Sequence, residues 1–175
     1  MDEMRLGLIP NYRRCWGVRG ERVIVPYAVK YEWSWLWLSV NVPEGKLEAL
    51  WTPRAGQDIS ESFLNHLRQA YPDSFVIVVW DGSGWHNIRN VPEGMLLVPL
   101  PAYSPELNPV ENLNGVLRGE TANAYLDDLS ENERLVDQKL REYWEDPESL
   151  VQLAFHPWIR KQWSQIQKLF SNCSY

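Results

Sequence analysis

Apolar side chains that recur at every second position predict a β-meander in the first part of the chain. A period of two places alternate side chains on opposite faces of a strand. The segments with strand character are 1–8, 23–30, 31–40 and 47–51, and a turn at 42–46 separates the last two. We expect an antiparallel sheet from these segments.

The strand over 31–40 carries Trp33, Trp35 and Trp37 on one face and aliphatic side chains on the other. Both faces are therefore expected to be covered. A central strand packed between helices is the interpretation that we favour. An aromatic platform on which nucleic-acid bases stack is the alternative.

A helix and two more strands follow the meander. Apolar residues at helical spacing predict a helix over 59–70, with Asp58 or Ser60 as its N-cap. Residues 75–80 are mostly β-branched, which is typical of a strand buried on both faces. A shorter apolar segment, 95–99, predicts another strand.

From residue 130 onward the pattern is helical. Ser130 and Glu133 form a capping box for a helix that ends near residue 144. A second helix starts at Asp146-Pro147, and a third follows His156-Pro157. The basic residues of this last helix are Arg160, Lys161 and Lys168. A solvated face is the simpler interpretation of that charge, and contact with a DNA backbone is the alternative.

Composition and charge narrow the possible functions. The 175 residues, 45% of them hydrophobic and 23% charged, suit one folded domain over 1–175. The net charge of −6 argues against binding nucleic acid through a broad basic surface, although acids that hold divalent metals contribute to that charge. No apolar run is long enough to span a membrane, so we expect a cytoplasmic protein. Its cysteines, Cys15 and Cys173, are then expected as reduced thiols rather than a terminal disulfide.

Three acids stand where strands or helices begin or end. Glu111 falls three residues after Asn108, a good N-cap, so it fits a capping box. Asp81 ends the 75–80 strand before Gly-Ser-Gly, which fits either a turn or the ligand site of an α/β fold. Asp2 opens the first strand, and a solvated, frayed chain end is its simplest interpretation.

The loop before Glu111 resembles a family signature. Residues 101–112 read Pro-Ala-Tyr-Ser-Pro-Glu-Leu-Asn-Pro-Val-Glu-Asn, similar to the signature of the DDE transposases of the mariner superfamily, in its bacterial insertion-sequence branch. In that family the Glu of Asn-Pro-x-Glu-Asn is the third catalytic carboxylate. The resemblance implies this role for Glu111 and makes Asn112 a further site candidate. The chain departs from the family at Asn114, where Trp is usual, and we expect this change to affect helix packing more than chemistry.

The same resemblance implies the other two catalytic acids. The family's first acid opens an Asp-Glu pair, which corresponds to Asp2. Its second acid is followed by a His four or five residues later, which corresponds to Asp81 and His86. His86 is a candidate for binding DNA phosphate or orienting a carboxylate, and an ordinary loop histidine is the alternative. Because only Met1 precedes Asp2, we expect a truncated first strand and a poorly fixed Asp2.

The implied fold is α/β and ribonuclease H-like, a mixed five-stranded sheet with helices on both faces. The order of the predicted strands and helices agrees with it. The resemblance further implies that Asp2, Asp81 and Glu111 hold Mg²⁺ or Mn²⁺. Two such ions, about 3.5–4 Å apart, can stabilise the attacking and leaving oxygens of a phosphodiester.

The implied function is that of a transposase catalytic domain, which cleaves DNA at transposon ends and joins them to target DNA. The implied partners are DNA and a second copy of the chain, as a homodimer on DNA. The family's N-terminal helix-turn-helix modules are absent from these 175 residues, so a separately encoded N-terminal product is a further expected partner. Two alternatives stay open: an inactive remnant or dimerising partner of a complete transposase, and a cellular ribonuclease H-like nuclease.

Overall fold

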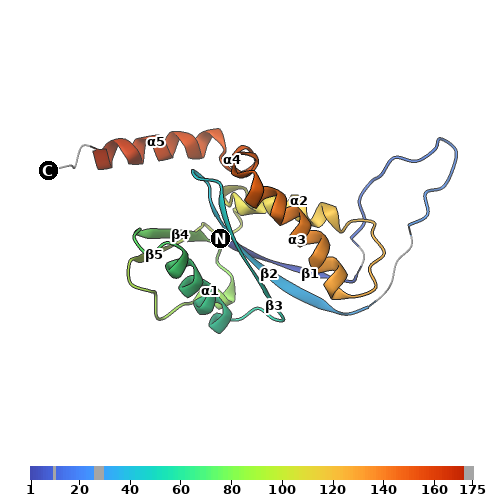
Figure 1. Ribbon diagram of the computed structural model, residues 1–175, viewed down its shortest axis with the longest axis horizontal. Coiled ribbons are helices and arrows are strands. Elements are labelled where there is room, and N and C mark those ends of the chain that lie inside the picture. The colour runs from blue at the N-terminus through green and yellow to red at the C-terminus, as the bar shows by residue number, and fades with distance from the viewer. Residues whose placement is uncertain (10, 26–29, 172–175) are drawn as a thin grey trace.

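The computed structural model describes residues 1–9, 11–25 and 30–171. In chain order its elements are β1 (Asp2–Gly7), β2 (Trp33–Asn41), β3 (Lys46–Thr52), α1 (Gln57–Ala70), β4 (Val76–Trp80), the short 3-10 helix η1 (Gly84–His86), β5 (Met95–Pro99), the short 3-10 helix η2 (Pro105–Leu107), α2 (Val110–Glu120), α3 (Leu129–Glu145), α4 (Pro147–Ala154) and α5 (Pro157–Ser171) (Figure 1). Within these described ranges, no helix is both long and apolar enough to cross a membrane.

The first three strands form an antiparallel sheet with β2 in the centre. The register sets Met4 opposite Leu36 and Glu3 opposite Trp37. Met4 and Leu36 therefore lie on one face, and Glu3 and Trp37 on the other. Trp37 is fully buried, which agrees with a central strand between two covered faces. The predicted strands over 1–8, 31–40 and 47–51 are confirmed.

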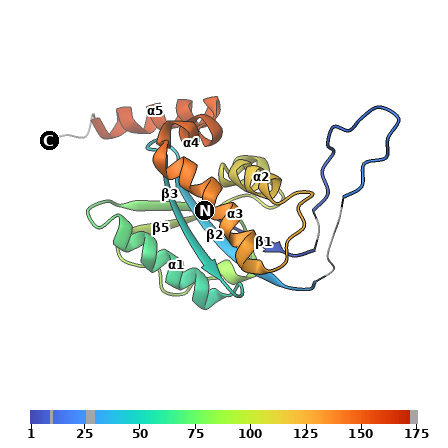
Figure 2. The same ribbon diagram turned by 45° about the vertical axis from the view of Figure 1, so that its right-hand side comes forward.

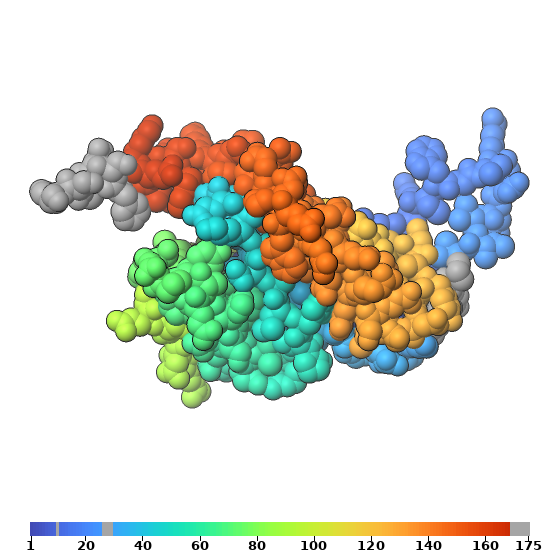
Figure 3. Space-filling view, in the orientation of Figure 1, coloured from blue at the N-terminus to red at the C-terminus, as the bar shows by residue number. Residues whose placement is uncertain are grey.

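The candidate strand over 23–30 is wrong wherever it can be checked. Residues 23–25 and 30 form no strand, and 26–29 lie outside the described residues. Since β2 already pairs with β1 on one edge and β3 on the other, it has no edge left for another strand. Residues 11–25 instead run as a loop that projects from the body, and Trp16 on it is fully exposed (Figures 1 and 3).

β4 and β5 form a separate parallel pair. The described strands thus make a sheet of three and a sheet of two, and the expected continuous five-stranded sheet is not formed. A hydrogen bond from the Met1 amino group to the Val79 carbonyl oxygen, at 2.8 Å, connects β1 with β4. Because β1 begins at Asp2, only Met1 reaches β4, and one bond does not make a ladder.

One face of the β4–β5 pair is open, contrary to the expectation for residues 75–80. Val78 and Trp80 are buried, whereas Ile77 is 57% and Leu96 is 49% exposed. A run of β-branched residues shows that a strand is apolar on both faces. It does not show which face another element covers.

The three-stranded sheet lies between two hydrophobic clusters. On one face, Met4 and Leu36 pack against buried residues of α2, α3 and α4. On the other face, Trp37 packs against α1 and the β4–β5 pair. Figure 2 shows α2 and α3 on one side of this sheet and α1 on the other. Helices on both faces are therefore confirmed.

Two helices begin differently from the prediction. The side chain of Asp58 pairs with Arg54, and α1 starts after Gly56 without a side-chain cap. The cap of α3 is Asp128, whose carboxylate accepts from the Glu131 N–H at 2.8 Å, rather than Ser130. The predicted starts of α4 and α5 are confirmed, and α5 extends away from the body (Figure 3).

Candidate functional site

Asp2 enters the site because the alternation of β1 turns it toward α2, on the same face as Met4. The residue is only 5% exposed. Asn114 Nδ2 donates to Asp2 Oδ2 at 2.6 Å and lies 3.4 Å from Glu111 Oε2. Glu111 and Asn114 are one turn apart on α2, so a single amide connects carboxylates from two different elements.

The beginning of β1 is held through the backbone of Met1. Its amino group donates to Val79 of β4 at 2.8 Å, and its carbonyl oxygen accepts from Asn108 Nδ2 at 3.3 Å. These contacts, from β4 and from the proline-rich loop, hold the strand where it begins. The interpretation of Asp2 as a solvated end and the expectation that it is poorly fixed are therefore both wrong.

Burial and like charge raise the pKa of Asp2 from its ordinary value of 3.8 to about 7. Burial is the largest cause, and the negative charge of Glu111 is the next. Glu3 and Asp81 add to the rise, while the Met1 ammonium opposes it. Asp81 and Glu111 thus lie close enough to Asp2 for their charges to raise its pKa. A divalent cation can compensate such a concentration of negative charge.

Glu111 does not form the capping box that its spacing allowed. The backbone N–H of Asn108, the donor that such a box would use, bonds to the Pro105 carbonyl oxygen at 2.9 Å. Asn108 Oδ1 instead accepts from the N–H of Val110, the first residue of α2, at 3.3 Å. The Glu111 carboxylate is thereby left to interact with Asn114.

Asp81 directly follows β4, and its side chain is 48% exposed. Its Oδ1 accepts from the Ser83 N–H at 3.1 Å, which is the local turn bond expected of Asp in this place. The same oxygen lies 2.9 Å from His86 Nδ1. The predicted turn is therefore confirmed. Because both contacts use Oδ1, the other carboxylate oxygen, Oδ2, remains available for a role in a site.

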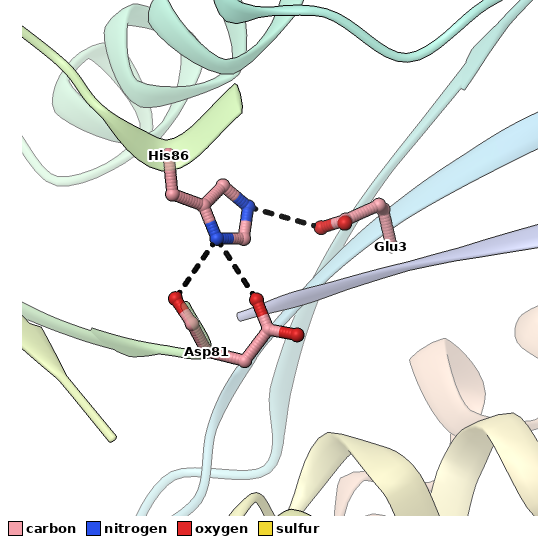
Figure 4. A group of neighbouring side chains, drawn as sticks. All are labelled: Glu3, Asp81 and His86. Atoms are coloured by element: carbon pink, nitrogen blue, oxygen red, sulfur yellow. Dashed lines mark hydrogen bonds and ion pairs between the residues drawn. The ribbon is translucent and has the colours of Figure 1, made fainter. Parts of the chain in front are cut away.

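Glu3 lies on the opposite face of β1 from Asp2 and reaches the loop after β4. His86 Nε2 lies 3.1 Å from Glu3 Oε2, and Trp85 Nε1 donates to Glu3 Oε1 at 2.7 Å (Figure 4). Burial alone would lower the pKa of His86, but the hydrogen bond and charge of Glu3, together with Asp81, outweigh burial and raise it. His86 is therefore not an ordinary loop histidine.

Glu3 is a member of this cluster that the family resemblance does not point to. The signal that could have found it was the period of two in β1, which points residues 2 and 3 to opposite faces. One acid then faces α2, and the other faces the β4–η1 loop.

The capacity for metal depends on which acids converge. Within the described part of the chain, one set of three side chains has ligand atoms within 4.8 Å of one another, namely Glu3, Asp81 and His86. The predicted set of Asp2, Asp81 and Glu111 is coupled through charge but is more widely spaced. Asn114 Oδ1 is buried without a hydrogen-bond partner. It is an amide oxygen, the kind of atom that Mg²⁺ prefers as a ligand, and it lies on a side chain that contacts two carboxylates.

The two asparagines of α2, Asn112 and Asn114, have different kinds of partner. Asn112 Nδ2 donates to the Leu153 carbonyl oxygen at 3.2 Å and also contacts His156, so Asn112 joins α2 to α4. Asn114, whose departure from the family is expected to affect helix packing more than chemistry, bonds to Asp2. The departure from the family at this position therefore concerns the acids themselves.

A family model described as DDE superfamily endonuclease matches residues 1–132. A curated relative, the uncharacterized protein y4pE/y4sA of Sinorhizobium fredii, is 31% identical over 84 residues. That match covers 46% of this chain and 62% of the relative, so the chain spans less than two thirds of the relative's length.

Solved structures of Mos1 transposase have a similar fold. A pre-cleavage Mos1 transpososome superposes with a TM-score of 0.60 at 17% identity and covers 87% of this chain and 52% of the Mos1 chain. The Mos1 paired-end complex with the left transposon end gives 0.59 at 18% identity, covering 86% and 51%. A Mos1 paired-end complex with Mn gives 0.59 at 17% identity, also covering 86% and 51%. The chain thus spans about half the length of Mos1, and at these identities the likeness concerns the fold.

Proposed function

Since this chain belongs to the DDE superfamily endonuclease family, we propose that it is a transposase catalytic domain that hydrolyses DNA phosphodiesters with divalent metal. The observation that carries this proposal is the gathering of carboxylates from three separate elements. Asp2 comes from β1, Asp81 follows β4, and Glu111 lies in the first turn of α2. Burial, and after it the negative charge of the neighbouring acids, raises the pKa of Asp2, and a divalent cation would offset that concentration of negative charge.

Asp2, Asp81 and Glu111 would hold Mg²⁺ or Mn²⁺, as a pair of ions. Bound there, the ions supply activation of a water or hydroxyl and stabilisation of the leaving oxygen. With a cation bound there, Asp2, whose pKa is about 7, would be held as the carboxylate, because the positive charge favours that form. The Asn114 amide, which contacts both Asp2 and Glu111, would keep the two carboxylates side by side.

The DNA substrate and the partners are part of the same proposal. Cleavage at transposon ends, strand transfer to target DNA and a homodimer on DNA are supported by the fold shared with Mos1 paired-end complexes and the Mos1 Strand Transfer Complex. A separately encoded N-terminal product is a further proposed partner.

Calorimetric titration with Mn²⁺ tests the metal site. The wild type should bind, and the Asp81→Asn, Glu111→Gln double variant should lose most of the affinity, since both changes remove charged oxygen ligands but keep side-chain shape. Asp73→Asn, at an exposed position after α1, is the control for a general loss of negative charge. Equal binding by the wild type and the double variant would refute the assignment.

Nicking of supercoiled plasmid in the presence of Mn²⁺ then distinguishes an active catalytic domain from an inactive dimerising partner. A wild type that nicks, with a double variant that does not, supports the catalytic domain. A wild type that binds Mn²⁺ but never nicks DNA, alone or with a complete transposase, supports the inactive dimerising partner.

A further inference from the structure

The loop after β4 and the start of β1 form a buried network on the face of the sheet opposite Asp2. We propose that Glu3 and His86 are positioning residues for Asp81, holding one of its carboxylate oxygens so that the other is kept for the metal. This inference rests on the proposed function, because it gives the Asp81 carboxylate a ligand role.

The imidazole of His86 lies between two carboxylates. Its Nε2 is 3.1 Å from Glu3 Oε2, and its Nδ1 is 2.9 Å from Asp81 Oδ1 and 3.0 Å from the Asp81 carbonyl oxygen. Figure 4 shows these three contacts and shows the second carboxylate oxygen of Asp81 pointing away from the ring. With the Ser83 N–H also on Oδ1, Asp81 has one restrained oxygen and one free for a ligand.

His86 itself has little freedom to move. Its ring stacks on Trp80 with centroids 4.3 Å apart and planes at 11°. The side chains of His86 and Glu3 are 3% and 4% exposed. Buried charged groups are retained in proteins when they are paired and hydrogen-bonded, and here each of these side chains is bonded to the other.

Glu3 is occupied on both oxygens, since Oε1 accepts from Trp85 and Oε2 meets His86. Trp85 is in turn fixed by an edge-on contact with Trp35 of β2, with ring centroids 5.6 Å apart. Glu3 therefore anchors the histidine to the three-stranded sheet. Asp81, at 48% exposure, is the member least enclosed by other side chains. A metal ligand must be held to within about 0.5 Å, so Asp81 is the residue that most needs such contacts.

Mn²⁺ affinity, measured by calorimetry on the whole chain, tests the network. Glu3→Ala should weaken binding by about 10–100-fold, the usual loss when a residue that supports a metal ligand is removed. Glu3→Gln should recover at least part of it, because its amide oxygen can still accept from His86. The matched control is Glu148→Ala, which removes an exposed acid from the first turn of α4. Equal affinities for Glu3→Ala and Glu148→Ala, with both folded, would overturn the proposal.

A metal-free measurement separates failure of this inference from failure of the proposed function. The carboxyl ¹³C resonance of Asp81 should shift in His86→Phe. This substitution keeps an aromatic ring on Trp80 but loses the polar contacts with Glu3 and Asp81. If wild type binds no Mn²⁺, the proposed function fails, and an unmoved resonance refutes the positioning contact independently. A third result is also decisive. If Mn²⁺ binding survives in the Asp81→Asn, Glu111→Gln double variant but is lost in Glu3→Ala, then Glu3 and His86 hold the ion themselves, and the positioning role is wrong.

Discussion

Replacement of Asp2 by asparagine should stabilise the metal-free protein at neutral and alkaline pH. The fold raises the pKa of Asp2 from 3.8 to about 7, so the native state binds the Asp2 proton more tightly than the unfolded chain does. Stability that is present below pH 4 is then lost as the pH rises to about 7. The difference corresponds to about 4 kcal/mol at pH 8 as an upper limit, a large fraction of the 5–15 kcal/mol typical of a domain.

Asparagine removes this penalty and keeps the shape of the site. Its amide oxygen can accept from Asn114 Nδ2, which lies 2.6 Å from Asp2 Oδ2. The buried Met1 amino group, whose pKa burial lowers from 8.0 to about 6, has the opposite effect on stability, which rises between pH 6 and 8. Because Met1 is present in both proteins, the difference between wild type and Asp2→Asn is dominated by Asp2.

Urea unfolding at pH 4, 6 and 8, without metal, measures this difference. The gain in the free energy of unfolding should be near zero at pH 4, intermediate at pH 6 and largest at pH 8. Asp73→Asn, an exposed acid, should show no such trend. Saturating Mn²⁺ should reverse the order at pH 8, since only the wild type has all three acids to bind it. A gain that does not change with pH, or a loss at pH 8, would refute the electrostatic reasoning.

Three further outcomes are expected. Asn114→Ala should lower the free energy of unfolding by about 1–3 kcal/mol and raise the pKa of Asp2 in a carboxyl NMR titration. The control Asn112→Ala, which breaks a contact with α4, should leave that pKa unchanged. Equal Asp2 titrations in the two variants would contradict the role of Asn114. Five to seven β-prone residues added ahead of Met1 should leave the affinity for Mn²⁺ measured by calorimetry unchanged, because the start of β1 is already held at β4 and at the proline-rich loop; a large gain in affinity would show that Asp2 is poorly fixed without them. In a gel shift, the chain with its net charge of −6 should bind DNA weakly and lose binding steeply as salt rises, whereas a nanomolar, sequence-specific complex would contradict this.

Local patterns predicted the parts of the fold that depend on local physics. The strand over 31–40 and the acids Asp81 and Glu111 at element ends followed from a period of two, turn residues and a helix start. Period two could not give the pairing of strands. The strand expected over 23–30 rests on local apolar content alone, and residues 23–25 and 30 form no strand. The caps of α1 and α3 were misplaced because neighbouring polar residues compete for the same N–H groups.

The contacts that build the site depend on tertiary packing and were not predictable from spacing. Asn114 was expected to pack, and it bonds to Asp2 because α2 crosses the start of β1. The sequence allows His86 to bind phosphate, to orient a carboxylate or to be an ordinary loop histidine, and it suggests no role for Glu3. Which role His86 has depends on how the loop after β4 folds back onto β1, and the local sequence does not indicate that fold. The family resemblance supplied the three candidate acids and His86, but not the contacts of Glu3 and Asn114.

The attachments of β1 connect segments that are very far apart along the chain. Met1 meets Val79 across 78 residues, Glu3 meets His86 across 83, and Asp2 meets Asn114 across 112. Closing such long loops costs entropy before any contact is gained, so contacts of this kind form slowly during folding. A chain in which β1 has not yet docked holds Asp81 and Glu111 but lacks Asp2. The proposed metal site would therefore be complete only in the fully folded chain, and partly folded chains should remain inert toward DNA.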